Sequence, residues 1–352
     1  MGMNPTDLTN ENRKYTPAPS VREAKPDWSE LPPALTAKIE TLIGSNITDA
    51  KTAWGGYSNA FSALVQTENH KTYYIKGSHP EQMSHGAKHL AQEVWAYENC
   101  AAVQKMAPAF IGTVAEGGED DWRLAIWQGL SRGEIRTQWR DTDYQSFAKT
   151  WQHALDGSTG NLTAAAQTNF IENIVNGKAG WRKFTTYEPR RDEFSSAFQN
   201  PEAALRWLDE NIDRLTDLAK QTPQHKSIPC HFDMRSDNIL FVDQTCYLID
   251  WPNLCAAPFG YDLIYLTMEL SMQGNGPAET ILKRLEDALD IQIPESDVRI
   301  ILSQLCGYLA LQFYREVPTV MPRLRWLQRG VFQAGIDWAQ TLKIISKMPE
   351  IK

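Results

Sequence analysis

The chain has 352 residues, of which 42% are hydrophobic and 22% charged, and its formal net charge is −8. This composition is typical of a packed globular protein with two or three core-sized units, and it excludes collagen-like and disordered chains. The acidic balance excludes the basic surface that a nucleic-acid-binding protein needs. Because the acidic residues are spread thinly along the chain, they indicate no acidic substrate pocket either.

The cysteines indicate a reducing compartment. They contain no C-x-x-C pair and their number is odd, so they predict neither a zinc site nor a disulfide framework. We expect reduced, mostly buried thiols. The chain also has no run of 18 apolar residues and no secretory signal at its start, so we expect a cytoplasmic protein with no membrane partner. The five cysteines are Cys100, Cys230, Cys246, Cys255 and Cys306.

The first third of the chain is predicted to form a β-rich unit. Residues 1–33 are polar and rich in proline, and we expect a flexible N-terminal arm. A first helix is predicted over Pro33–Ile43 from its apolar spacing. Two short β-prone runs, Phe61–Thr67 and Thr72–Lys76, predict a hairpin.

A longer helix is predicted over Glu81–Val103, and two further β-prone runs follow at Phe110–Val114 and Arg123–Trp127. Antiparallel strands with one long helix make a small α+β unit, so we predict an N-lobe of residues 34–130. From residue 131 to 352 the periodicity is mostly helical, which predicts a larger C-lobe. Its expected helices cover about 142–156, 160–176, 201–221, 262–273, 277–289, 296–315 and 322–347.

The last of these helices carries an apolar stripe that is interrupted by Gly330 and Gly335. Such a stripe suits either a dimer interface or an ordinary core-facing helix. Interior glycines weaken an isolated helix, which favours the core-facing alternative. The oligomeric state stays open.

One island, residues 228–251, breaks the helical pattern. Two apolar runs, Ile239–Val242 and Cys246–Ile249, predict a hairpin. Asn238 stands just before the first run and Asp250 just after the second, so a hairpin places them at the same open end. Their side-chain oxygens are hard ligands that suit Mg²⁺, with substrate phosphates and water completing its coordination.

Asp233 lies on the loop before this hairpin, where it can face a substrate hydroxyl. A metal clamp on a nucleotide together with a carboxylate at the nucleophile is what phosphoryl transfer requires. The spacing H-x-D-x-x-x-x-N has an expected chance frequency of about 0.02 in a chain of this composition. The alternative, a polar turn with capping residues, is therefore less favoured.

These residues resemble a known catalytic segment, that of the aminoglycoside phosphotransferase and choline kinase-like family. The resemblance implies a two-lobed protein kinase-like fold that uses ATP or GTP with Mg²⁺. It makes Asp233 the catalytic base and Asn238 and Asp250 the metal ligands, with His231 holding the loop and Asp262 bonding to backbone. The motif reads His231-Phe-Asp233-Met-Arg-Ser-Asp-Asn238, then Leu248-Ile-Asp250-Trp.

The same resemblance places nucleotide-binding parts in the N-lobe. Lys76 matches the lysine that pairs with the α- and β-phosphates. Glu93, 17 residues later, would hold Lys76 as an ion pair, and Glu98 is the alternative. Between two strands lies a segment where glycine lets backbone N–H groups approach phosphates; an ordinary hairpin turn is its alternative. Its candidate ligands are Gly55, Gly56, Ser58 and Asn59.

The chain also departs from protein kinases. It has Ile-Asp-Trp-Pro in place of Asp-Phe-Gly and no long activation segment, which disfavours a regulated protein kinase. We expect a small-molecule kinase acting on a hydroxylated substrate, most of all an antibiotic of the aminoglycoside type. A metabolic kinase of an amino sugar or choline-like alcohol, and a catalytically silent nucleotide-binding regulator, are the alternatives. Trp251, Gln273 and Asn275 are weaker candidates for substrate contact.

Overall fold

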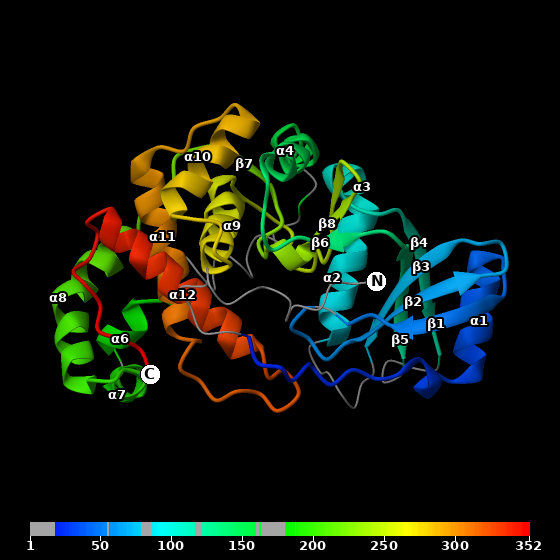
Figure 1. Ribbon diagram of the computed structural model, residues 1–352, viewed down its shortest axis with the longest axis horizontal. Helices are drawn as coiled ribbons and strands as arrows, with labels where there is room; N and C mark the ends of the chain where they lie inside the picture. Colours follow the sequence, from blue (N-terminus) through cyan, green and yellow to red (C-terminus); the bar gives the residue numbers. More distant parts are fainter. Residues whose placement is uncertain are drawn as a thin grey trace.

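The computed structural model shows a β-rich lobe beside a larger helical lobe (Figure 1). This mixed α+β architecture confirms the fold class expected from the sequence. A sheet with α1 on its outer side forms one lobe, and helices dominate the other. The structure describes residues 18–54, 56–78, 86–116, 122–159, 162, 180–186 and 188–352.

The N-lobe is built on a five-stranded antiparallel sheet with strand order β1-β2-β3-β5-β4. Alternate residues of β2, β3 and β5 face a small hydrophobic core beneath α1, as expected for period-2 strands. The predicted hairpin is confirmed, with β3 two residues longer. The strands are β1 Ile47–Thr52, β2 Phe61–Thr67, β3 Thr72–Ser78, β4 Phe110–Ala115 and β5 Arg123–Gln128.

The helices of the N-lobe cover both faces of this sheet. Helix α1 (Pro33–Ile43) has the predicted bounds, with proline at its first turn and the left-handed Gly44 as its C-cap. The long helix predicted over 81–103 is instead α2 (Gly86–Asn99) and α3 (Ala101–Met106). The two are separate because Cys100 has an extended backbone. Residues 81–85 lie outside the described part.

The described part of the expected N-terminal arm is packed rather than loose. Residues 18–27, here called the N-terminal strap, run from beside α12 toward α1 (Figure 1). The Ala24 N–H donates to the Val320 carbonyl of the C-lobe, and Glu23 is only 2% exposed. Leu31, a few residues on, joins the core beneath α1. The arm was expected to be flexible because its composition is polar, but a buried ion pair and a few apolar anchors fix it.

The C-lobe begins with short strands that frame the 228–251 island. Strand β6 (Glu134–Ile135) pairs with the hairpin of β8 (Ile239–Val242) and β9 (Thr245–Leu248), and β7 (Ser227–Cys230) pairs with β10 (Cys255–Pro258). The predicted hairpin is confirmed to within one residue. Strands β6, β7 and β10 are not predicted from the sequence, because two to four residues carry too little periodicity.

Helices supply the rest of the C-lobe. Most of the predicted ones are confirmed with ends shifted by a few residues, while α6 and α7 were not predicted. The helix expected over 160–176 lies outside the described residues except for Leu162. The helices are α4 Asp141–Leu155, α6 Arg182–Thr186, α7 Glu188–Ser196, α8 Pro201–Ala219, α9 Gly260–Met272, α10 Ala278–Leu289, α11 Glu295–Ala310 and α12 Leu324–Thr341.

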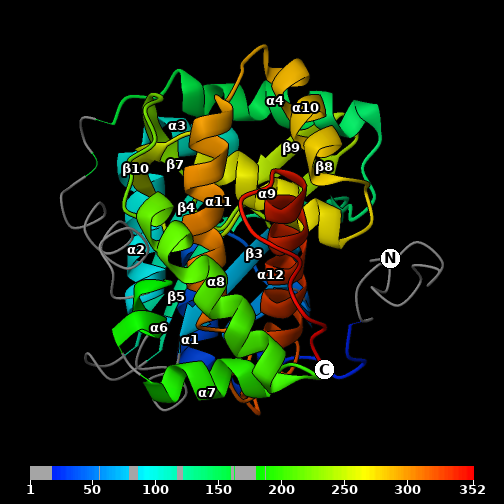
Figure 2. The same cartoon turned by 90° about the vertical axis from the view of Figure 1, so that its left-hand side faces the viewer.

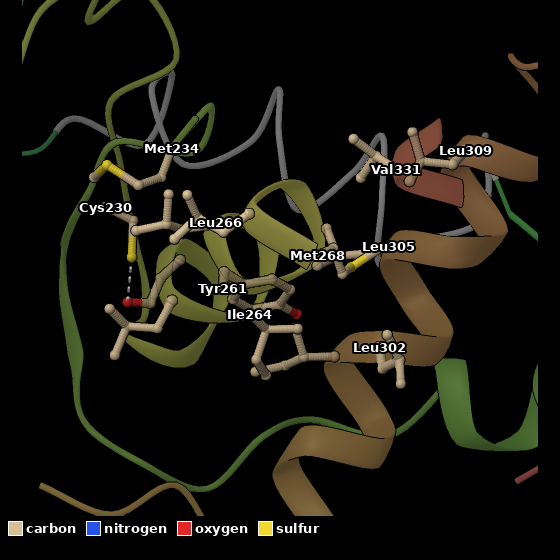
Figure 3. Packing of buried hydrophobic residues seen from close by; sticks show 14 of the residues in the cluster. Cys230, Met234, Tyr261, Ile264, Leu266, Met268, Leu302, Leu305, Leu309 and Val331 are labelled. Atoms are coloured by element: carbon tan, nitrogen blue, oxygen red, sulfur yellow. Dashed lines mark hydrogen bonds between the residues drawn. The ribbon is translucent and has the colours of Figure 1, made fainter. Parts of the chain in front are cut away.

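Helix α12 faces the core of its own chain. It packs on α9 and α11, with α8 on the outer side of α11 (Figure 2), and Val331 meets Leu305 and Leu309 in the close view of Figure 3. A Cβ at Gly330 would lie 2.3 Å from the Met272 sulfur, so this glycine allows a close helix contact. The apolar stripe is thus used for core packing, as the interior glycines indicate.

Candidate active site

The hairpin of the C-lobe brings two predicted residues to one end. Asn238 precedes β8 and Asp250 follows β9, and the Ile249 N–H donates to the Asn238 carbonyl at 3.0 Å. Asp250 has a left-handed backbone, with φ of 67°, and it turns the chain away from the strand. Both side chains therefore stand at the same open end.

The loop before the hairpin is held from α9. The Asp262 carboxylate accepts the backbone N–H groups of His231 and Phe232 at 2.9 and 2.8 Å, as the resemblance implies. Phe232 is left-handed, with φ of 66°, and the two bonds stabilise that conformation. The fully buried His231 ring bonds through Nε2 to the Ile249 carbonyl at 2.8 Å. Its role is to join the loop to the hairpin.

Asp233 is presented by this loop within a network of hydrogen bonds. Its Oδ1 accepts from Arg235 Nη1 at 2.8 Å, and its backbone carbonyl accepts from Asn238 Nδ2 at 2.8 Å. Burial raises the pKa of Asp233 to about 6, although the Arg235 guanidinium opposes the shift. At neutral pH the carboxylate is ionised and is a competent proton acceptor.

Two further acids stiffen the same loop. Arg235 Nε also donates to Asp237 at 2.8 Å, so one guanidinium bridges two carboxylates. The buried Glu269 of α9 accepts from the backbone N–H and hydroxyl of Ser236 at 3.1 and 2.9 Å. Neither Arg235 nor Glu269 was among the predicted site residues. Arg235 lies inside the quoted motif, two residues after Asp233, while Glu269 carries no local signal.

Lys76 on β3 connects the two lobes. Its ammonium lies 2.7 Å from Glu93 Oε2 on α2 and 2.6 Å from Asp250 Oδ1. Burial alone would lower the pKa of Lys76, but the two carboxylates outweigh it and the pKa is raised. The predicted partner Glu93 is buried at 3% exposure, whereas the alternative Glu98 is exposed.

The segment between β1 and β2 contacts the C-lobe. Gly55 lies outside the described residues, and Gly56 has a left-handed φ of 67° that favours glycine. The Gly56 carbonyl accepts from Arg323 Nη2 at 3.0 Å. Ser58 and Asn59 lie in the same irregular loop, half-buried.

Tyr57 at the tip of this loop lies against the C-lobe. Its ring centroid is 5.2 Å from the Arg235 guanidinium carbon and 5.4 Å from that of Arg323, a pair of cation–π contacts. The loop is thereby held down over the residues around Asp233. Tyr57 stood in the quoted segment but was not predicted to bind anything.

The weaker candidates are structural. Trp251 is 1% exposed and packs on the His231 ring at 4.5 Å, so it is not available to a substrate. The Asn275 side chain bonds to the Trp139 N–H and to the Thr137 carbonyl, which joins the loop after α9 to the segment before α4. Gln273 is buried and donates to Glu269.

The donor set at the hairpin end suits magnesium. Asn238 Nδ2 is used toward Asp233, which leaves its Oδ1 as the available ligand atom, and Asp250 adds a carboxylate. No group of three or more His, Cys, Asp or Glu side chains in the described part of the chain could hold a metal by itself. Two oxygen side chains that need phosphate oxygens and water are the usual mode for Mg²⁺ beside a nucleotide.

Two lobes joined through a lysine–carboxylate cluster, with a buried aspartate loop at their junction, define a kinase-like phosphotransferase. The sequence matches the model of the phosphotransferase enzyme family over residues 49–292, more than half of the chain. The chain belongs to this family and is a phosphotransferase with an alcohol group as acceptor. The comparison with curated protein sequences finds no match.

Solved structures confirm the protein kinase-like fold. The chain is similar to a spectinomycin phosphotransferase in complex with ADP and spectinomycin, with 16% identity, a TM-score of 0.61, and coverage of 89% of this chain and 98% of the other. An aminoglycoside phosphotransferase in a ternary complex with ADP and hygromycin B has 12% identity, a TM-score of 0.53, and coverage of 87% and 99%. An aminoglycoside phosphotransferase from Alicyclobacillus acidocaldarius has 13% identity, a TM-score of 0.53, and coverage of 89% and 96%.

A membrane-spanning helix is not found among the described residues.

Proposed function

We propose that this protein is a Mg²⁺-dependent small-molecule kinase that transfers the γ-phosphate of ATP or GTP to a substrate hydroxyl. The observation that carries this proposal is the convergence of Lys76, Asp233, Asn238 and Asp250 on one junction between the lobes. Lys76 and Asp250 are 174 residues apart in the sequence and are joined there by a direct ion pair.

In this proposal the two lobes divide the work. The N-lobe, residues 34–130, binds the nucleotide, with Gly55, Gly56, Ser58 and Asn59 covering its phosphates. Lys76 holds the phosphates and Glu93 orients Lys76 through their 2.7 Å ion pair. The C-lobe, residues 131–352, supplies catalysis and the acceptor site.

Asn238 and Asp250 would hold the magnesium ion, which when bound neutralises charge on the phosphates. Asp233 accepts the proton of the attacking hydroxyl and orients it toward the γ-phosphate. Arg235 fixes the Asp233 carboxylate through the 2.8 Å bond described above, so that little reorganisation is needed when the acceptor binds.

For the acceptor, we propose an antibiotic of the aminoglycoside type. Support comes from the family match and from the likeness in fold to structures that contain spectinomycin and hygromycin B. The alternative acceptor is a hydroxylated metabolite such as an amino sugar or a choline-like alcohol. A catalytically silent nucleotide-binding protein is disfavoured because the complete set of reactive side chains is present.

The test is phosphate transfer from ATP and from GTP, with Mg²⁺, to a panel of aminoglycosides, other hydroxylated antibiotics and amino sugars. Asp233→Asn should lower kcat by about two to four orders of magnitude, the usual contribution of general-base catalysis, with little change in nucleotide affinity. Asp237→Asn is the matched control, because Asp237 bonds to the same Arg235 from the other side. We expect a much smaller loss of kcat there.

A normal kcat for Asp233→Asn would show that the base is wrongly assigned. Absence of transfer to every acceptor, together with ATP binding that Asp250→Ala leaves unchanged, would overturn the kinase proposal and favour the silent nucleotide-binding alternative.

A further inference from the structure

The N-terminal strap crosses from one lobe to the other at the site. Its Glu23 forms an ion pair with Arg323, which precedes α12, and Glu23 is almost fully buried there. The same guanidinium donates to the Gly56 carbonyl of the loop between β1 and β2. One arginine of the C-lobe therefore fixes both the strap and the loop between β1 and β2.

Two residues after Glu23, the strap directs Lys25 onto the face of the sheet opposite α1. Lys25 Nζ donates to Ser62 Oγ on β2 at 2.9 Å. Ser62 lies directly opposite Lys76 in the β2–β3 register, and residues paired in this way project from the same face of a sheet. The Lys25 ammonium therefore lies on the face that carries Lys76 and approaches Asp250.

The surroundings of Lys25 are unusual for a lysine. Within the described ranges its ammonium makes no ion pair with a carboxylate, and its hydrogen bond goes to a neutral hydroxyl that is itself buried. Burial and the neighbouring Lys76 together lower the pKa of Lys25 to about 8, while Asp250 and Glu23 act in the opposite sense. Holding a cation in such a place is costly unless an anion joins it.

We propose that Lys25 is a second phosphate-binding cation, which the strap delivers beside Lys76 to contact the phosphate chain of the bound nucleotide. This inference rests on the proposed nucleotide-dependent function and adds a residue from outside the two-lobed core. The Glu23–Arg323 ion pair is the positioning contact, because it fixes the strap two residues before Lys25. A polyphosphate supplies the anionic partner that Lys25 lacks, so binding should favour the charged form of this lysine.

Other roles for the strap predict different effects of removing Lys25 on nucleotide binding. If Lys25 merely filled the nucleotide site, its removal would strengthen nucleotide binding instead of weakening it. If the strap only stabilised the fold, removal of the Lys25 ammonium would weaken the binding of nucleosides and nucleotides alike. If Lys25 contacts the phosphates, its removal weakens the binding of ATP and leaves the binding of adenosine unchanged.

The experiment measures dissociation constants of ATP and of adenosine by calorimetry on the full chain, with Mg²⁺ and without acceptor. Lys25→Met should raise Kd for ATP by about tenfold or more, the usual effect of losing a hydrogen bond to a charged group, and change Kd for adenosine by less than about twofold. Lys25→Arg should restore most of the ATP affinity. Lys25→Gln also removes the ammonium but keeps a hydrogen-bond donor for Ser62, so it replaces Lys25→Met if that variant folds poorly.

Two further variants complete the design. Lys38→Met removes one lysine from the exposed face of α1, where Lys38 bonds to the Ala115 carbonyl, and should leave both constants unchanged. Glu23→Gln should weaken ATP binding less than Lys25→Met and spare adenosine, as expected of a positioning residue.

If the ratio of the dissociation constants for ATP and adenosine is the same in Lys25→Met as in the wild-type protein, or if the variant binds ATP more tightly, this inference is overturned and the kinase proposal stands. A wild-type protein that binds no nucleotide would overturn both.

Discussion

At the residue scale, the junction between the lobes is an arrangement of opposite charges that a nucleotide would rearrange. Lys76 lies between Glu93 and Asp250, and Arg235 lies between Asp233 and Asp237. Arg235 is buried and Lys76 largely so, and each is balanced by two carboxylates, which is how charges with little access to water are tolerated. Lys25 lacks such a partner in the described part of the chain, and this difference singles it out.

The pH dependence of nucleotide binding should report on Lys25. Its pKa is lowered to about 8 by burial, with Lys76, Asp250, Glu23 and Arg323 as the charged groups around it. Phosphates would raise this pKa, so above pH 8 binding requires proton uptake. Titration of Lys25 should leave ATP affinity unchanged below about pH 8, where the ammonium is already charged, and should lower it by up to about tenfold per pH unit as the pH rises above 8.

Calorimetry in buffers of different ionisation enthalpy measures this uptake directly. Lys25→Met should show no such uptake above pH 8, and an identical pH profile in both proteins would contradict the assignment.

At the element scale, the first turn of α9 organises the loop that carries Asp233. The Asp262 carboxylate accepts two backbone N–H groups, and about two turns later Glu269 accepts two groups of Ser236. The helix thus acts as a rigid base for an irregular segment. Burial raises the pKa of both carboxyls, and their hydrogen bonds act against that shift.

Removal of the Asp262 carboxylate should destabilise the folded protein. Asp262→Ala leaves the backbone N–H groups of His231 and Phe232 without their acceptor, at about 1–3 kcal/mol each, so we expect a loss of about 2–6 kcal/mol in the free energy of unfolding. Urea denaturation measures it, and kcat should fall as well because Asp233 is on the same loop.

Asp287→Ala is the control, since it removes an exposed carboxylate that pairs with Lys283 one helical turn away. Its cost should stay below about 1 kcal/mol. Equal stability of the two variants would show that Asp262 does not support the loop.

At the scale of the whole molecule, a large core runs through the C-lobe into the inner side of the N-lobe, and the cysteines lie within it. Burial raises the pKa of the Cys246 thiol to about 12 and places the pKa of Cys230 and Cys255 well above the usual range. Cys230 also donates to the Ala257 carbonyl, drawn as a dashed line in Figure 3. Since the thiolate is the reactive form, these side chains should be inert in the folded protein.

We therefore expect the native protein to react with an aromatic disulfide reagent at neutral pH no faster than it unfolds. All five thiols should react promptly in urea. The absorbance of the released aromatic thiolate gives the number of reactive cysteines and the rate of their reaction. One thiol that reacts rapidly in the native state would contradict the burial described here.

Much of this protein is determined by local sequence. Period-2 runs such as Phe61–Thr67, the helix Pro33–Ile43 between a proline and a glycine, and the hairpin flanked by Asn238 and Asp250 are encoded within a few residues. Their geometry follows from backbone sterics and burial of one face, so the arrangement of the hairpin end could be predicted. The 17-residue spacing of Lys76 and Glu93 pointed to their ion pair through the family resemblance.

Only the tertiary structure decided which side chains from distant segments meet. Lys25 meets Ser62 across 37 residues, Lys76 meets Asp250 across 174, and Glu23 meets Arg323 across 300. The polar composition of the N-terminal strap predicts a loose arm, because no local pattern records a partner that far along the chain. Composition and periodicity determine which segments fold and which face they bury. Where a single charged side chain comes to rest is decided by the packing of whole lobes, since the cost of burying a charge depends on neighbours that only the folded chain brings together.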